Sequence, residues 1–149
     1  MERIALFVND AAHARHLLQP MLAPGVAAHW IVVACPPTLT RHAGRWVSRQ
    51  ARRAWRERWA DELVAQIAPK MRAAPGSQVD TQLASRPLLE VSASLQRRWP
   101  GVRLFDARCP ALGRQDEPIT AAQPPASAER WAGGVLAAGG LTAVLTLVD

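Results

Sequence analysis

The hydrophobic run RIALFV at residues 3–8, followed at once by Asn9 and Asp10, is the stretch that decides the fold. A short apolar run that stops at polar residues is typical of a strand buried on both faces of a sheet. Asp10 is a suitable N-cap, so a helix is predicted over residues 11–22, bent or ended by Pro20. A buried strand that passes directly into a helix begins a β-α-β unit.

The same alternation of strand and helix continues along the chain. Further strands are predicted at residues 29–34, 77–84, 102–107 and 141–148, and further helices at residues 41–72, 85–99 and 126–138. Ser85 is the predicted cap of the helix at 85–99. The strand at 77–84 is half polar, which favours a place near the sheet edge. This order predicts an α/β fold, a three-layer α/β/α sandwich around a five-stranded parallel sheet.

Length and composition fit a single domain over residues 1–149. Hydrophobic residues make up 49% of the chain, which excludes a disordered tail and a disulfide-stapled mini-protein. Residues 110–125 contain four prolines and are predicted to form an irregular loop within the domain. The uncharged run at 132–148 holds four glycines. It is shorter than the roughly 20 residues of a spanning helix, so no membrane segment is expected.

The two cysteines, Cys35 and Cys109, each end a predicted strand and each precede a proline. The first residues show no signal-peptide pattern, so a cytoplasmic protein with reduced thiols is expected. His13 and His16 share one helix face, but no further metal ligand follows from the sequence, and no metal site is predicted.

Residues 3–10 with the following Ala12-His13-Ala14-Arg15, and the strand at 29–37, resemble the first two strands of the universal stress protein family. The resemblance extends over nearly the whole chain as an order of elements. It implies a Rossmann-like sheet of the adenine nucleotide alpha hydrolase type, with strand order 3-2-1-4-5. It also implies that Asp10, or Asn9 beside it, faces a nucleotide at the strand tips. A homodimer through the last strand is implied as well, with an interface of Leu141, Ala143, Leu145 and Leu147.

The region after the fourth strand departs from the family pattern. Nucleotide-binding relatives carry several glycines there, whose backbone N–H groups approach the phosphates. Residues 109–118 hold one glycine, Gly113, and two prolines, which lack the N–H donor. This departure from the family pattern therefore predicts a divergent member that has no cofactor and does not bind ATP in the family manner.

Five arginines recur at helical spacing in the long predicted helix. The steps between them are four, four, three and four, which places on one helix face Arg41, Arg45, Arg49, Arg52 and Arg56. A helix of thirty residues spans about 45 Å, whereas a six-residue strand spans about 20 Å. The apolar second half can cover the sheet, so the basic half is predicted to project beyond the carboxyl ends of the strands, where ligands bind in open α/β sheets.

Two interpretations of this arginine stripe remain open. It faces an anion, namely a phosphate-bearing small molecule, nucleic acid or an acidic protein surface, or it is a solvated helix end with the pairs Arg53–Glu57 and Arg58–Glu62. The chain has 17 arginines and one lysine, a bias typical of GC-rich bacterial coding sequence. Nucleic acid is disfavoured because no recognition motif is present. Trp46, Trp55 and Trp59 are expected to pack in the core or between helix and sheet, whereas exposed members would indicate an oligomer interface.

The sequence predicts a ligand cleft at the strand tips and no catalytic constellation. Its candidate residues are Asn9, Asp10, Cys35, Pro36, Arg41, Arg45, Arg49, Arg52, Arg108 and Arg114. The favoured function is a non-enzymatic, stress-protein-like binding or regulatory domain. The alternatives are binding of a nucleotide or other anionic ligand through the arginines from Arg41 to Arg56, including phosphate-ester hydrolysis, and an electrostatic adaptor for an acidic protein or nucleic acid.

Overall fold

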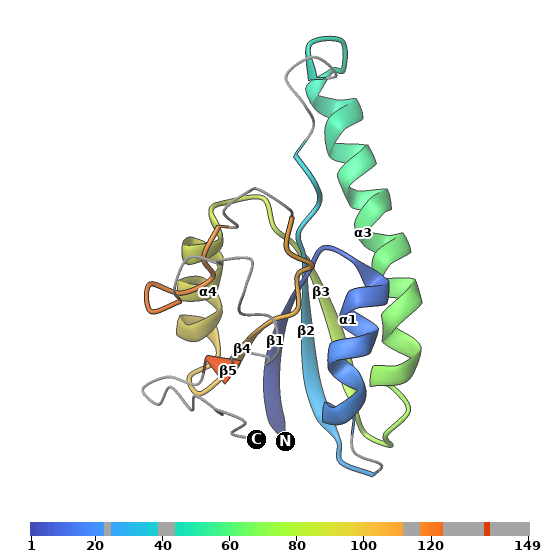
Figure 1. Cartoon of the computed structure of the whole chain (residues 1–149), viewed down its shortest axis with the longest axis vertical. Coiled ribbons are helices and arrows are strands. Elements are labelled where there is room, and N and C mark those ends of the chain that lie inside the picture. The colour runs from blue at the N-terminus through green and yellow to red at the C-terminus, as the bar shows by residue number, and fades with distance from the viewer. Residues whose placement is uncertain (23–24, 39–43, 112–116, 124–135, 138–149) are drawn as a thin grey trace, which may run out of the picture.

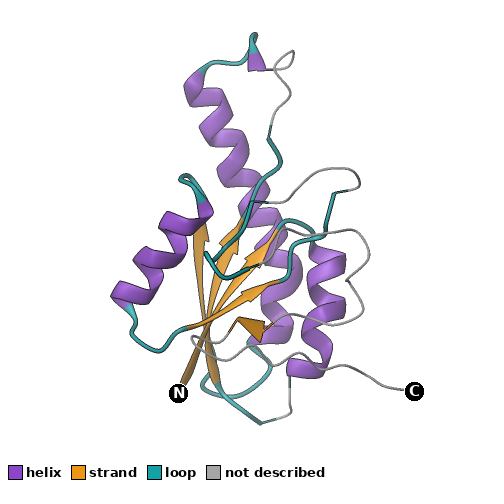
Figure 2. Ribbon diagram, turned by 60° about the vertical axis from the view of Figure 1, so that its left-hand side comes forward, coloured by secondary structure: helices purple, strands orange, loops and turns teal. Residues whose placement is uncertain are grey.

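A computed structural model gives the arrangement of the chain and describes residues 1–22, 25–38, 44–111, 117–123 and 136–137. The described elements, in chain order, are β1 (Glu2–Val8), α1 (Ala11–Leu18), η1 (Gln19–Met21), β2 (Ala28–Ala34), α3 (Arg49–Met71), β3 (Gln78–Leu83), α4 (Leu88–Arg98), β4 (Arg103–Asp106) and β5 (Leu136–Ala137). Strands and helices alternate through β4, as the sequence predicts (Figures 1 and 2).

The strand order of the sheet is β3-β2-β1-β4-β5. β1 pairs in parallel with β2 on one side and with β4 on the other, and β2 pairs in parallel with β3. The predicted parallel order 3-2-1-4 and the edge position of β3 are therefore confirmed. β1 lies at the centre because its run of apolar side chains is buried on both faces.

The last strand departs from the prediction. β5 pairs antiparallel with β4, through Phe105 with Leu136 and Leu104 with Ala137, so the sheet is mixed rather than wholly parallel. Leu136 and Ala137 fall within the helix predicted at 126–138, which therefore does not reach residue 138. The predicted parallel strand at 141–148 lies outside the described residues, and so do the expected dimer residues Leu141, Ala143, Leu145 and Leu147.

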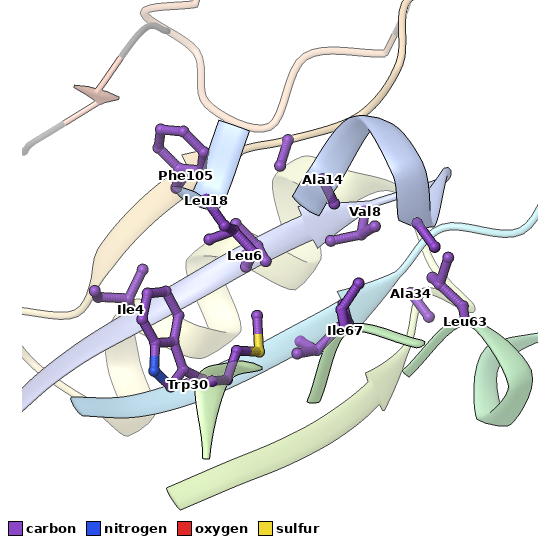
Figure 3. Close-up of a cluster of buried hydrophobic side chains, with 14 of the residues drawn as sticks. Ile4, Leu6, Val8, Ala14, Leu18, Trp30, Ala34, Leu63, Ile67 and Phe105 are labelled. Atoms are coloured by element: carbon purple, nitrogen blue, oxygen red, sulfur yellow. The ribbon is translucent and has the colours of Figure 1, made fainter. Parts of the chain in front are cut away.

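Each face of the sheet carries its own hydrophobic core. Alternate residues of β1 point to opposite faces, so Ile4, Leu6 and Val8 pack with α1 and α3, whereas Ala5 and Phe7 pack with α4. Figure 3 shows the first of these clusters, where side chains of β1 and β2 meet those of the two helices. The predicted three-layer arrangement is confirmed: α1 and α3 cover one face and α4 the other (Figure 2).

The first helix begins where the sequence predicts. The Asp10 side chain accepts a hydrogen bond of 2.7 Å from the backbone N–H of His13, an N-cap contact that fixes the start of α1. α1 ends at Leu18, and the chain continues as the short 3-10 helix η1, which contains Pro20. The predicted effect of this proline is therefore confirmed.

α3 is shorter at its start than the predicted helix over 41–72. It begins at Arg49 because the Ser48 side chain accepts a hydrogen bond of 3.1 Å from the N–H of Ala51. Its buried residues all lie in the second half: Ala60, Leu63, Ile67, Ala68 and Met71. The first half rises beyond the carboxyl ends of the strands (Figure 1), as helix and strand lengths predict.

Candidate functional site

The tips of β1, β2 and β4 meet at the upper edge of the sheet in Figure 1, where the cleft is predicted. Asn9 follows β1, and both the NH₂ group and the oxygen of its side-chain amide form hydrogen bonds with the backbone after β4. Its Nδ2 donates to the carbonyl of Cys109 at 3.0 Å, and its Oδ1 accepts from the Cys109 N–H at 2.6 Å. Asn9 therefore extends the β1–β4 pairing by one step, and its polar groups are used within the protein.

A buried ion pair lies beside this contact. The guanidinium of Arg108 donates two hydrogen bonds to the carboxylate of Asp106, from Nε at 2.8 Å and from Nη2 at 2.9 Å. The two side chains are only 8% and 10% exposed. Nη2 also donates to the carbonyl of Glu117 at 2.6 Å. This predicted anion-binding arginine therefore has a bidentate carboxylate partner of its own.

The loop at 117–123 is fastened to the same ion pair. Gln123 donates from Nε2 to Asp106 Oδ2 at 2.7 Å and accepts from the N–H of Ile119 at 2.7 Å. The Glu117 carboxylate accepts from the N–H of Leu88 at 2.6 Å, at the start of α4. The prediction that Ser85 caps this helix is wrong, because the residue at the cap is Pro87, which makes no side-chain cap bond. The Glu117 carboxylate, from a loop distant in the sequence, accepts a backbone N–H hydrogen bond at the start of α4 in place of a cap residue.

Cys35, at the tip of β2, is half-buried and packs against the hydrophobic cluster beneath α4. Burial raises the pKa of its thiol to about 12, although the positive charge of Arg108 acts in the opposite direction. A thiol protonated at neutral pH is a poor nucleophile and a poor metal ligand. Both cysteines are free. Pro36 is half-buried beside Cys35, and Asp10 is exposed and caps α1, so neither adds a free polar group directed at a ligand.

The backbone amides after β4 are also engaged. The N–H of Arg108 donates to Asp106 Oδ1 at 3.2 Å, and the N–H of Cys109 to Asn9 Oδ1 at 2.6 Å. In a nucleotide site these are the groups that would approach phosphates. Gly113 and Arg114 lie outside the described residues. Within the described part, the strand tips form an internally satisfied polar cluster of Asn9, Asp106, Arg108, Glu117 and Gln123.

The predicted arginine stripe is not one helix face. Arg49, Arg52 and Arg56 lie on α3, Arg45 lies in the turn before it, and Arg41 lies outside the described residues. The Ser48 side chain caps a helix that begins at Arg49, so the backbone before it is not helical. Arg45 and Arg49 therefore do not share a helix face. The continuous helix over the five arginines is therefore a wrong prediction.

Two of these arginines hold the backbone in place. Arg52 Nη2 donates to the carbonyl of Gly44 at 2.9 Å and lies 3.5 Å from that of Val47, so it fastens the turn at 44–47 to the helix. Arg56 Nη2 donates to the carbonyl of Ala84 at 2.6 Å, just after β3. Arg52 and Arg56 are half-buried, and they anchor the projecting helix instead of forming an open binding face.

The remaining arginines of this segment are exposed. Arg53 pairs with Glu57 at 2.9 Å, as predicted, with 80% of its side chain still exposed. Arg45, Arg49 and Arg58 are exposed and form no ion pair with any other described residue, so the predicted Arg58–Glu62 pair is not formed. We call residues 45–58 the basic arm.

Trp46 lies at the tip of the basic arm and is 88% exposed. The expectation that it packs in the core is wrong, because the turn that carries it stands beyond the sheet. Trp55 and Trp59 are half-buried, and Trp59 packs against the core cluster beneath α1 and α3. Exposed tryptophan together with arginine is typical of protein interfaces.

The described part of the chain contains no group of three or more histidine, cysteine, aspartate or glutamate side chains that could hold a metal ion. No helix there is both long enough and apolar enough to cross a membrane.

Comparison with models of protein families, with curated proteins and with solved structures gave no match to this chain.

Proposed function

We propose that the protein is a non-enzymatic binding domain of the universal stress protein type, which engages an acidic segment of a partner protein through the basic arm. The observation that carries the proposal is the exposed, uncompensated charge of the arm beside Trp46. The strand order β3-β2-β1-β4 and the helix that projects past the strand tips support the architectural part of the proposal.

The positive charge of the chain is concentrated in the arm. Residues 45–58 hold six arginines and one glutamate, whereas the rest of the chain holds 12 basic and 11 acidic residues. The arm therefore carries a net +5 of the formal +6. A coding bias toward arginine would spread the charge over the whole surface. Its concentration on one projecting element favours a role in binding.

The chemistry of the arm favours an acidic polypeptide over nucleic acid. Single-stranded nucleic acid is held by several aromatic side chains on which successive bases stack. Trp46 is exposed, but Trp55 and Trp59 are half-buried, and Trp59 packs against the core. One exposed tryptophan among arginines suits a short acidic segment that carries an apolar side chain for Trp46.

The strand tips support the proposal that ATP is not bound in the family manner. The N–H groups of Arg108 and Cys109 already have partners, and so has the Arg108 guanidinium. Phosphate-ester hydrolysis through the arginine stripe is disfavoured because Arg52 and Arg56 donate to backbone carbonyls.

Binding of poly-L-glutamate, followed by fluorescence anisotropy at low and moderate salt, tests the function. The triple variant Arg45→Gln, Arg49→Gln, Arg58→Gln is expected to bind about tenfold more weakly, at about 0.5 kcal/mol for each exposed charge. The matched control is Arg72→Gln, Arg86→Gln, Arg97→Gln, which removes three exposed arginines elsewhere and leaves the same net charge.

Three results would contradict the proposal. Equal losses in the arm variant and in the control would show that only net charge matters. Tighter binding of a single-stranded oligonucleotide than of poly-L-glutamate at the same salt would assign the arm to nucleic acid. Binding of ATP with the same affinity by the wild-type chain and both triple variants would indicate that the binding site lies at the strand tips and not on the basic arm.

We further propose a cytoplasmic homodimer that forms through residues 141–148. In the reducing cytoplasm the free thiols of Cys35 and Cys109 stay reduced. The wild-type chain is expected to sediment as a dimer, and Leu145→Lys to sediment as a monomer because a charge enters an apolar interface. Leu89→Lys, at an exposed leucine on α4, is the control and should leave the dimer intact. A monomeric wild-type chain would overturn this part.

A further inference from the structure

A cavity lies at the end of the sheet opposite to the strand tips. It has a volume of about 450 Å³ and lies between the amino ends of β1 and β2, the helix η1 and the last turn of α3. Glu2 and Ile4 line it from β1, Ala28 and Trp30 from β2, and Met71 from α3. Its volume is within the range of small-molecule sites, about 300–1,000 Å³.

The floor of the cavity is apolar and part of the core. Ile4, Trp30 and Met71 line it, and all three belong to the hydrophobic cluster beneath α1 and α3. Figure 3 shows Ile4 and Trp30 side by side on the adjacent strands β1 and β2. These three residues are at most 5% exposed and contribute little accessible surface, whereas Met21, Leu22 and Val26, which also line the cavity, are more exposed. Such a floor suits the apolar body of a ligand.

The rim of the cavity has a positive charge without a counter-charge. Lys70, the only lysine of the chain, lines the cavity and forms no ion pair with any other described residue. Glu2 is the acidic residue of the lining, and its carboxylate is paired with Arg103. Because the acidic charge is already neutralised, the rim attracts an anionic group.

We propose that this cavity binds a small amphipathic carboxylate, with its apolar body on Ile4, Trp30 and Met71 and its carboxylate paired with Lys70. The apolar floor requires a hydrophobic body, and the unpaired ammonium group at the rim requires one anionic head. The proposal is independent of the basic arm, which lies at the other end of α3 (Figure 1).

Titration with decanoate, followed by amide chemical shifts of the uniformly labelled full chain, tests the proposal. Saturable binding is expected, with shifts at Gln19, Ala28, Lys70 and Ala73, which surround the cavity, and none on the basic arm. Lys70→Gln is expected to weaken decanoate binding about fivefold to tenfold, and to leave the binding of decan-1-ol unchanged. Lys70 is exposed, so this variant is expected to fold normally.

A second variant fills the cavity. Ala74→Phe, at its wall, should abolish the binding of both decanoate and decan-1-ol, whereas Ala65→Phe, at an exposed position of α3, should change neither. Absence of saturable binding to the wild-type chain, or equal weakening of acid and alcohol by Lys70→Gln, would overturn the proposal. So would a wild-type dimer that Ala74→Phe dissociates, since a second copy would then cover the cavity.

Discussion

Arg108 is the residue on which the strand tips depend. Its side chain donates hydrogen bonds to the carboxylate of Asp106 and to the backbone carbonyl of Glu117, and Gln123 donates a further hydrogen bond to the Asp106 carboxylate. The sequence places Arg108 at the correct edge of the sheet, but it does not indicate that the partner of the guanidinium lies two residues earlier in the same chain. The buried pair holds the loop at 117–123 in place. A buried ion pair is stable only when both charged groups have all their hydrogen-bond partners.

Loss of the Arg108 guanidinium is expected to destabilise the fold strongly. Arg108→Met leaves the Asp106 carboxylate buried without its counter-charge, which costs about 3–5 kcal/mol of the free energy of unfolding. Urea denaturation followed by circular dichroism measures the loss. Arg103→Met is the matched control, because it removes a partly exposed pair with Glu2 and should cost less than about 1 kcal/mol. Equal losses would contradict the role given to Arg108.

Cys35 makes stability depend on pH in the alkaline range. Its thiol has a pKa of 9.0 as a reference and of about 12 in the folded protein, because burial disfavours the thiolate. Between these values the folded state holds a proton that the unfolded state has lost. The free energy of unfolding therefore falls as pH rises above about 9, by at most about 1.4 kcal/mol per pH unit from this group.

Cys35→Ala should make this alkaline loss shallower than in the wild-type chain. Urea midpoints at a series of pH values from 8 upward measure the slope, and Cys109→Ala controls for removal of a thiol. The same slope in the wild type and in Cys35→Ala would refute the assignment to Cys35.

At the scale of elements, α3 is a helix with two different halves. No side chain from Arg49 to Trp59 is buried, whereas the second half packs on the sheet. Ser48, Arg52 and Arg56 supply the contacts that hold the first half in place. The first half therefore relies on a cap and on side-chain bonds to the backbone, and its stability is local.

Glycine substitutions in the two halves are expected to act differently. Ala54→Gly, in the exposed half, should lower the local stability of the arm by about 1 kcal/mol and change the global free energy of unfolding little. Ala60→Gly, in the buried half, should lower the global value by at least about 1 kcal/mol. Native-state hydrogen exchange separates the two effects. Equal global losses would show that the arm unfolds only with the body.

Most of the elements could be predicted from the sequence, because strand length, apolar runs and caps are local signals. Asp10 and Pro20 indicate the limits of α1, and the apolar run at 3–8 indicates the central strand. The start of α3 and the cap of α4 could not be predicted as well. The sequence is compatible with a helix that begins at Arg41 and with one that begins after Ser48, the cap found in the structure. Glu117 lies 29 residues after Leu88, so its contact with the start of α4 depends on the folded chain. Trp46 is exposed because α3 begins only at Arg49, which leaves Trp46 in the turn before the helix.

At the scale of the whole molecule, the two proposed binding surfaces lie at opposite ends of one helix. The basic arm lies at the start of α3, beyond the carboxyl edge of the sheet, and the cavity lies beside Lys70 and Met71 at its end. The strand tips lie between them, and the candidate residues Asn9, Asp10 and Arg108 are hydrogen-bonded to other groups of the protein there. The surface features that could recognise a partner are therefore found at the periphery of the sheet, whose centre serves as a scaffold.

The central place of β1 also has a consequence for how the chain reaches its fold in a cell. Ile4 pairs with Arg103, so one side of the first strand waits for a partner almost a hundred residues later. At about 5–20 residues per second, a ribosome needs roughly 5–20 s to make that stretch. During this interval a strand with five consecutive buried apolar residues has an open edge, and the nascent chain then needs protection from aggregation.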